Sequence, residues 1–205
     1  MKETELAEKF INYFCDFEVF KEVPANGIID FVVKNGIVIM AVEVKLSLNF
    51  EVIEQANKNK SYCDYSYIAV PRPKKESFAY DICKMLGIGV LVYDDWAINE
   101  TVKPLKNKRH KFYKLKLENY MKRSVAGSQN DRITPFKATI ERMVIYISRH
   151  PGCTLNECLN NIDFHWSNLT SAKACVYQWI KKGIIKEFKI EKNVLILNEN
   201  YERKT

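Results

Sequence analysis

The 205-residue chain lacks long apolar runs, and none reaches the ~18 residues that a membrane-spanning helix needs. Its N-terminus is polar and charged and has no apolar segment typical of a signal peptide. The six cysteines, at positions 15, 63, 83, 153, 158 and 175, include no C-x-x-C pair. This dispersal disfavours a disulfide framework and predicts reduced thiols in a cytoplasmic protein.

Charges of the two signs are distributed unevenly along the chain. Residues 1–99 hold 11 Lys and Arg against 15 Asp and Glu, residues 100–132 hold 10 against 3, and residues 133–205 hold 11 against 7. We therefore predict an acidic N-terminal domain over 1–99, a basic connector over 100–132 and a mildly basic C-terminal domain over 133–205.

The connector has two interpretations. It is either a solvated linker or a segment that contacts phosphates, since Lys and Arg release counterions when they neutralise a nucleic-acid backbone. Two aromatic residues, Phe112 and Tyr113, are interleaved with its basic residues. The candidate contacts are Lys103, Lys106, Lys108, Arg109, Lys111, Lys114 and Lys116.

The most informative pattern surrounds Asn35-Gly36, a dipeptide typical of two-residue hairpin loops when apolar runs flank it. If these residues form the loop, paired residue numbers sum to 71. Side chains alternate between the two faces of a sheet, so Asp30, Glu43 and Lys45 share one face. Asp30 and Glu43 are then diagonal neighbours, ~7–8 Å apart, and can bind one divalent cation together.

These three ionisable residues interrupt segments 28–33 and 37–46, which are otherwise nearly continuous apolar runs. Such runs are typical of strands covered on both faces. Ionisable groups in that setting pair with one another, bind a metal or change their pKa. One interpretation is a buried ion pair without chemistry, although such pairs are weak stabilisers. The other interpretation is a functional site.

Asp30, followed across a hairpin by Glu43-Val44-Lys45, resembles the PD-(D/E)XK nuclease superfamily, also called restriction-endonuclease-like. In that superfamily a helix carrying Gln follows the E-x-K strand and precedes the next core strand. Segments 54–56 and 62–71 match this order. The resemblance covers roughly the first 95 residues of the chain.

Two positions depart from the superfamily pattern. Ile29 precedes the Asp where Pro is usual, and Asn59 stands where some members have Tyr. Only Gln55 is therefore carried over from the helix motif as a catalytic residue. Its alternative interpretation is an exposed residue that favours the helix.

The resemblance implies a Mg²⁺-dependent phosphodiester hydrolase, with Mn²⁺ as a substitute cation. Asp30 and Glu43 would bind the ion through carboxylate oxygens, and the Val44 carbonyl would be a third ligand. Lys45 would position or deprotonate the attacking water, or offset phosphate charge. The role of base depends on burial that lowers the pKa of Lys45.

Hydrophobic periodicity predicts helices over 3–15, 50–60 and 76–86, and strands over 18–23, 65–70 and 89–93 beside the hairpin. This alternation indicates an α/β fold, and the resemblance makes it a restriction-endonuclease-like α/β/α sandwich with a mixed sheet. Superfamily members often place a Glu of the first helix near the metal. Glu5 and Glu8 are the candidates, and simple solvation is the alternative.

Helical periodicity resumes after residues 124–133, which have linker composition. Helix 135–149, a short helix after the Thr154-x-x-Glu157 capping box, and a helix capped by Ser167 or Asn168 precede a hairpin. This order resembles a small winged helix-turn-helix domain, whose third helix enters the DNA major groove. The candidate DNA contacts are Ser171, Lys173, Tyr177 and Lys181 on that helix, with Lys189 and Lys192 on the wing.

Two alternatives compete for this C-terminal domain. Many winged helices bind proteins instead of DNA, and the third helix is not richly basic. A zinc site is also conceivable, although its spacing matches no usual structural-zinc pattern. Its ligands would come from His150, Cys153, Cys158, His165 and Cys175.

These patterns predict a metal-dependent DNA endonuclease whose winged helix serves DNA targeting or assembly. Restriction, phage and transposon nucleases combine such parts, and the transposon end-cleaving subunits, which this combination is similar to, act with partner proteins. Double-strand cutting from one site per chain would require a homodimer. The alternative is a non-catalytic DNA-binding regulator on a nuclease-like fold, and RNA stays open as a substrate.

Overall fold

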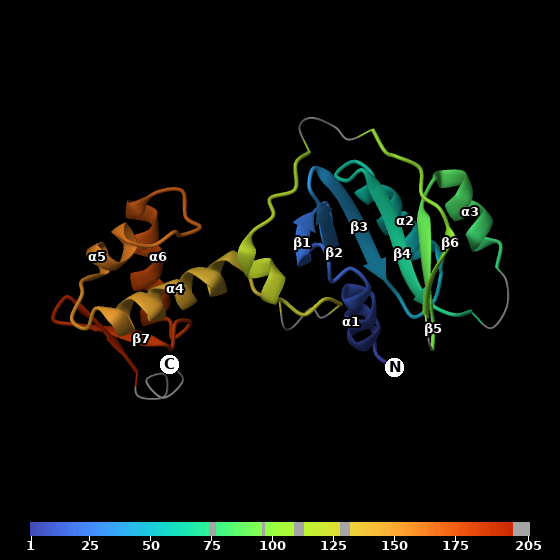
Figure 1. Ribbon diagram of the computed structural model, residues 1–205. Helices are drawn as coiled ribbons and strands as arrows, with labels where there is room; N and C mark the ends of the chain where they lie inside the picture. The colour runs from blue at the N-terminus through green and yellow to red at the C-terminus, as the bar shows by residue number, and fades with distance from the viewer. Residues whose placement is uncertain (74–76, 96, 109–112, 128–131, 199–205) are drawn as a thin grey trace. The chain divides into compact units, whose positions relative to one another are not determined.

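The computed structural model describes all residues except 74–76, 96, 109–112, 128–131 and 199–205. The chain divides into two compact units, Met1–Arg132 and Ile133–Thr205 (Figure 1). Within the described residues, no helix is long and apolar enough to cross a membrane.

The first unit is a mixed α/β structure built on a six-stranded sheet. Its elements are α1 (Glu3–Tyr13), β1 (Glu18–Ala25), β2 (Gly27–Asn35), β3 (Val38–Val44), α2 (Phe50–Asn59), β4 (Tyr65–Pro71), α3 (Ala79–Leu86), β5 (Gly89–Asp94), β6 (Ala97–Val102) and the 3-10 helix η1 (Asn119–Arg123). The strands follow one another in chain order across the sheet. The β3–β4 and β4–β5 pairs are parallel and the others are antiparallel, so the sheet is mixed.

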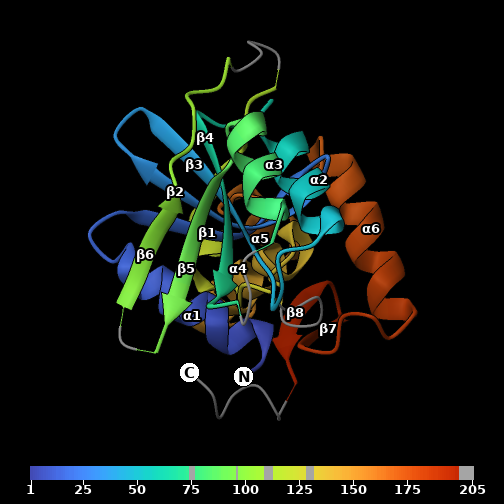
Figure 2. The same cartoon turned by 90° about the vertical axis from the view of Figure 1, so that its right-hand side faces the viewer.

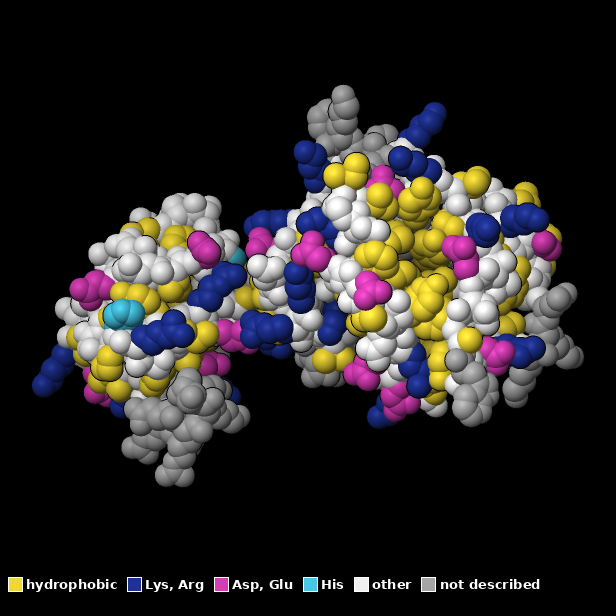
Figure 3. Space-filling view, in the orientation of Figure 1, with side chains coloured by type: hydrophobic (Ala, Val, Ile, Leu, Met, Phe, Trp, Pro, Cys, Tyr) yellow, Lys and Arg dark blue, Asp and Glu magenta, His cyan; other side chains and the backbone are white. Residues whose placement is uncertain are grey.

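Helices cover both faces of this sheet. The core on one face joins α1, through Leu6 and Phe10, to Phe31. The opposite face packs against α2 and α3, which lie together on that side (Figure 2). Because α1 is a single helix, it covers its face only in part, and apolar side chains are visible over the first unit in the space-filling view (Figure 3).

The β2–β3 hairpin turns one residue later than the sequence predicts. Asn35 pairs with Val38, so Gly36-Ile37 is the loop and paired residue numbers sum to 73 instead of 71. Gly36 has a φ of 58°, whereas Ile37 is not among the residues with positive φ. A two-residue loop with Gly at its first central position has this combination, and Asn35 therefore stays in the strand.

The predicted connector, residues 100–132, is part of the first unit and not a separate linker. Its first residues belong to β6, which pairs with β5. Beyond β6, the Leu105 N–H donates to the Gly87 carbonyl at 2.9 Å, and the Asn107 N–H donates to the Asp64 carbonyl at 2.7 Å. Backbone hydrogen bonds thus attach this basic segment to the sheet, a long-range pairing that its composition did not reveal.

The second unit contains α4 (Pro135–Arg149), α5 (Leu155–Asn160) and α6 (Leu169–Lys181), followed by the hairpin of β7 (Phe188–Glu191) and β8 (Val194–Leu197). Its three helices and hairpin enclose a core of their own, centred on Met143, Val176 and Phe188. The predicted capping box at Thr154 is confirmed, because its backbone N–H donates to Glu157 at 2.7 Å. Asn168, not Ser167, caps α6.

We expect residues 133–205 to fold when expressed alone, because this unit encloses its own core. Thermal unfolding followed by circular dichroism should be cooperative and start from a helical spectrum. A fragment carrying Val176→Asp, which places a charge in that core, is the control and should not fold. A gradual, non-cooperative transition in the unsubstituted fragment would contradict the expectation.

Candidate metal centre

The neighbouring strands β2 and β3, in the interior of the sheet, bring Asp30 and Glu43 together. Phe31 pairs with Val42, so in the same register Asp30 lies directly opposite Glu43. Both side chains point to the sheet face that α2 covers. The two acids act on each other electrostatically, and the charge of Asp30 helps to raise the pKa of Glu43. The predicted shared face is confirmed, because a change of two in the register sum leaves every side chain on its face. The two acids are directly opposite each other, and not diagonal as predicted, because the hairpin turns one residue later.

Each carboxylate has one oxygen fixed by an N–H donor. Asp30 Oδ2 accepts from the Val44 backbone N–H at 2.7 Å, and Glu43 Oε1 accepts from Asn59 Nδ2 at 2.6 Å. Glu43 is 3% exposed and Asn59 is 6% exposed. Hydrogen bonds to an ionised carboxylate are short and strong, so they orient both acids. Asn59 lies four residues after Gln55, and residues at this spacing share one side of a helix, so the sequence already placed Asn59 beside a candidate site residue.

Burial, together with the charge of Asp30, raises the pKa of Glu43 to about 8, although the Asn59 hydrogen bond lowers it. Burial also raises the pKa of Asp30, against the lowering effect of the Val44 N–H and of Lys45. Two carboxylates this close resist ionising together. Without a cation, the pair therefore retains a proton at neutral pH.

Lys45 follows β3 and forms an ion pair with Glu3, with Nζ and Oε2 3.3 Å apart. Burial by itself lowers the pKa of Lys45, but Glu3, Asp30 and Glu51 outweigh burial and the pKa is raised. Burial lowers this pKa as expected, but the three carboxylates reverse the net shift. The raised pKa keeps Lys45 protonated at neutral pH and disfavours the role of base.

The structure brings Glu3, not Glu5 or Glu8, to this site from α1. Glu5 accepts from the Lys2 N–H at 3.0 Å in the helix capping box, and Glu8 is exposed. Glu5 and Glu8 are both exposed, which agrees with simple solvation, the alternative interpretation. Glu3 lies three residues before buried Leu6 and so shares its side of the helix.

Gln55 carries a buried polar atom that needs an explanation. Among the described residues, its Oε1 is buried and has no hydrogen-bond partner. Leaving a buried acceptor unsatisfied costs free energy, and a water molecule or ligand is the usual explanation. Gln55 shares the side of α2 that carries Asn59, the residue bonded to Glu43. The amide oxygen is therefore an available acceptor on the helix side that carries Asn59.

The donor set suits a hard divalent cation. Within the described parts of the chain, no group of three or more His, Cys, Asp and Glu side chains is placed to hold a metal ion. The two carboxylates would therefore need backbone or water oxygens beside them. Mg²⁺ fits this arrangement, since it is usually held by one or two carboxylates and keeps several waters. Val44, the predicted third ligand, has its backbone at the site through its bond to Asp30.

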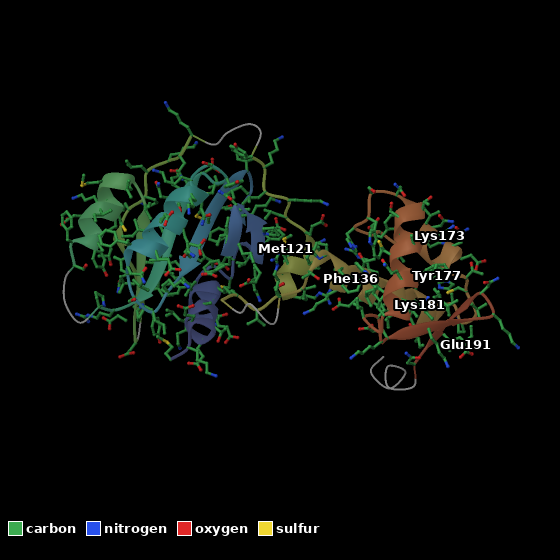
Figure 4. The ribbon with its side chains drawn as sticks, turned by 180° about the vertical axis from the view of Figure 1, so that it is seen from behind. Met121, Phe136, Lys173, Tyr177, Lys181 and Glu191 are labelled. Carbon is green, nitrogen blue, oxygen red and sulfur yellow. The ribbon has the colours of Figure 1, made fainter. Side chains whose placement is uncertain are left out.

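Three predicted DNA contacts lie in a row on α6. Lys173, Tyr177 and Lys181 follow one another at four-residue intervals along one side of the helix (Figure 4). Tyr177 is 49% exposed. Ser171 is only partly exposed, and its N–H donates to the Asn168 cap at 2.8 Å. No acidic residue occurs between positions 164 and 186, so the row lies in a basic segment.

The remaining predicted basic contacts differ in their surroundings. Lys192 is exposed in the β7–β8 turn, and Lys189 forms an ion pair with Glu191 at 2.7 Å. Lys108 is exposed on the first unit. The predicted contacts Arg109 and Lys111 lie outside the described residues.

The histidines and cysteines considered for zinc have other environments. His150 stacks on Tyr146, with ring centroids 4.2 Å apart, and His165 Nδ1 lies 2.9 Å from Thr139 Oγ1. Cys158 is fully buried in the core of the second unit. No three of these side chains gather as a metal site within the described residues, and all six cysteines are free.

No family model matches the chain, and no curated protein matches it. Among solved structures, the chain is similar to a protein of unknown function from Silicibacter pomeroyi. The identity is 16%, the TM-score is 0.39, and the match covers 74% of this chain and 94% of the other.

Glu43 should make the metal-free protein less stable as the pH rises. Its pKa is 4.5 in the unfolded chain and about 8 in the folded protein, so between these values the folded state binds more protons. The stabilisation is complete below pH 4.5 and is lost as the pH rises through 8. We expect the unfolding free energy of the wild type relative to Glu43→Gln to fall by about 1.4 kcal/mol per pH unit in that range.

Urea unfolding at several pH values in EDTA measures this difference. The control is Glu54→Gln, a change at an exposed residue of α2 that pairs with Lys58. It should keep the wild-type slope. Parallel pH profiles for the wild type and Glu43→Gln would contradict the raised pKa of Glu43.

Proposed function

We propose that this chain is a metal-dependent DNA endonuclease that hydrolyses phosphodiester bonds with Mg²⁺, or with Mn²⁺ in its place. The observation that carries the proposal is the pair of partly buried Asp30 and buried Glu43 on adjacent strands, with the Lys45 ammonium group beside it. The pKa of each acid is raised, and the two resist ionising together. Such a pair is costly to bury unless a cation completes it.

The residues of the site have complementary tasks. Asp30 and Glu43 would hold the cation through carboxylate oxygens. When bound, Mg²⁺ lowers the pKa of a coordinated water and neutralises charge on the scissile phosphate. Lys45 binds a phosphate oxygen and stabilises negative charge, which agrees with its raised pKa. Gln55 accepts a hydrogen bond from a water at the site through its unpaired oxygen.

We assign the first unit to the restriction-endonuclease-like sandwich and the second to the winged helices. The first assignment rests on the mixed sheet covered by helices on both faces, with the acids on adjacent strands β2 and β3. The second rests on three helices followed by a two-stranded hairpin. Both fold assignments come from the sequence resemblance, and the order of the helices and strands in each unit is compatible with them.

The second unit supplies DNA binding in this proposal. Lys173 and Lys181 flank Tyr177 on α6, and the hairpin carries exposed Lys192. A winged helix places its third helix in the major groove and touches the backbone with its hairpin. The lysines would contribute affinity independent of sequence, by releasing counterions from phosphates.

Substitution of the site should abolish cleavage without unfolding the protein. We expect Asp30→Asn, Glu43→Gln and Lys45→Met each to lower the rate of plasmid nicking in Mg²⁺ by about 100-fold or more, because each removes a charge that acts on the cation or the phosphate. Glu54→Gln, an exposed change on α2, is the matched control and should cut like the wild type. Wild-type rates for Glu43→Gln would exclude the assignment.

The row on α6 should set the salt dependence of DNA binding. We expect the double variant Lys173→Ala with Lys181→Ala to reduce the slope of log affinity against log salt by about 2, one for each lost phosphate contact. Fluorescence anisotropy with a labelled duplex measures it. The control Lys84→Ala changes an exposed lysine of the first unit. An unchanged slope would indicate that α6 does not face DNA.

A non-catalytic DNA-binding regulator is the alternative function. Metal-independent binding without nicking, in Mg²⁺, Mn²⁺ or EDTA, would favour it. Retention of Asp30, Glu43 and Lys45 in one place favours the enzyme, since a regulator gains nothing from two buried acids. If the enzyme cuts both strands, two copies or a partner DNA-processing protein must act together, because each chain supplies one site.

A further inference from the structure

The helix α2 does not require an asparagine side chain at position 59. It is the last residue of α2, is 6% exposed, and donates from Nδ2 to Glu43 Oε1 at 2.6 Å. Its backbone carbonyl ends the helix by accepting from the Tyr62 N–H at 2.9 Å. That bond needs no particular side chain. A buried amide costs free energy unless it is hydrogen-bonded, so the contact with Glu43 accounts for an asparagine here.

The Asn59 hydrogen bond has a counterpart on the other acid. Glu43 Oε1 is held by Asn59, and Asp30 Oδ2 is held by the Val44 N–H at 2.7 Å. Among the described residues, no further N–H donor is bonded to Glu43 Oε2 or Asp30 Oδ1. Each carboxylate therefore presents one oxygen that is free of N–H donors, and the fixed donors prevent the groups from turning.

One-oxygen coordination distinguishes between divalent cations. Mg²⁺ demands octahedral geometry with six ligands at ~2.0–2.1 Å, and it keeps several waters. Ca²⁺ takes about 6–8 oxygens at ~2.3–2.6 Å and often uses both oxygens of a carboxylate. A glutamate with one oxygen already occupied suits the first kind of cation better than the second.

We propose that Asn59 is a positioning residue that makes Glu43 a one-oxygen ligand and so selects small octahedral cations, Mg²⁺ and Mn²⁺, over Ca²⁺. The inference rests on the proposed function, because it concerns the same metal centre. It adds a determinant of cation choice at the position where some members of the superfamily that the sequence resembles have Tyr. Without Asn59, Glu43 is free to turn and to offer both oxygens to a larger ion.

Cation binding can be measured without DNA. Full-length protein freed of metal is titrated with Mn²⁺, and free Mn²⁺ is followed by electron paramagnetic resonance; Mg²⁺ and Ca²⁺ are then added as competitors. We expect Mg²⁺ to displace Mn²⁺ from the wild type and Ca²⁺ to displace it poorly. Asn59→Ala should weaken Mn²⁺ binding by roughly 10–100-fold, the usual effect of losing a residue that orients a ligand. Its Ca²⁺ affinity should change by a smaller factor, so that selectivity falls.

Two further variants make the test specific. Asn59→Leu fills the space of the asparagine but removes the donor, and it replaces Asn59→Ala if the smaller side chain destabilises the fold. Asn57→Ala changes an exposed asparagine of the same helix and should bind like the wild type. Thermal unfolding of every variant shows whether the fold is kept.

The outcomes separate this inference from the proposed function. If the wild type binds no Mn²⁺, the metal centre and the nuclease fail together with the inference. If the wild type binds Mn²⁺ and Ca²⁺ equally well, or if Asn59→Leu loses both cations by the same factor, the nuclease survives and the role of Asn59 is excluded. Loss of selectivity in Asn59→Leu, with Asn57→Ala unchanged, supports the inference.

Discussion

Two acids placed opposite each other on adjacent strands are the constraint on which the first unit depends. Asp30 and Glu43 lie on the sheet face that packs against α2, where Glu43 is 3% exposed. Three polar neighbours compensate part of the cost of burying these acids: the Val44 N–H and Asn59 each donate to one acid, and Lys45 lowers both pKa values. The compensation is incomplete, since both pKa values stay raised. In the proposed function, a divalent cation would supply the charge that these neighbours lack.

Positive charge is distributed unevenly between the two units. Residues 1–99 are acidic, but the basic segment that follows is bonded to their sheet, and residues 1–132 hold 21 Lys and Arg against 18 Asp and Glu. The first unit is therefore nearly balanced and has little net attraction for a polyanion. A basic stretch without acids covers α6 in the second unit, so long-range attraction to a nucleic acid would come mainly from there.

Local sequence patterns predicted the ends of helices well, but they predicted the pairing between segments less well. The caps at Thr154 and Asn168 mark helix starts where the sequence places them, because capping depends on a few neighbouring residues. The hairpin loop was displaced by one residue, because Gly36 suits either of two loops. The sequence did not predict strand β6, because β6 forms by pairing with β5 and its own residues are mostly exposed.

The sequence by itself determined that Asp30, Glu43 and Lys45 share one face, because side chains alternate along a strand and a register change of two preserves that alternation. It also contained the helix faces on which Glu3 and Asn59 lie. Only the tertiary structure decided that these faces meet the carboxylates and that Lys45 keeps its proton. Such outcomes depend on distances between segments that are far apart in the chain, whereas spacing along the sequence reports only on neighbours within one element.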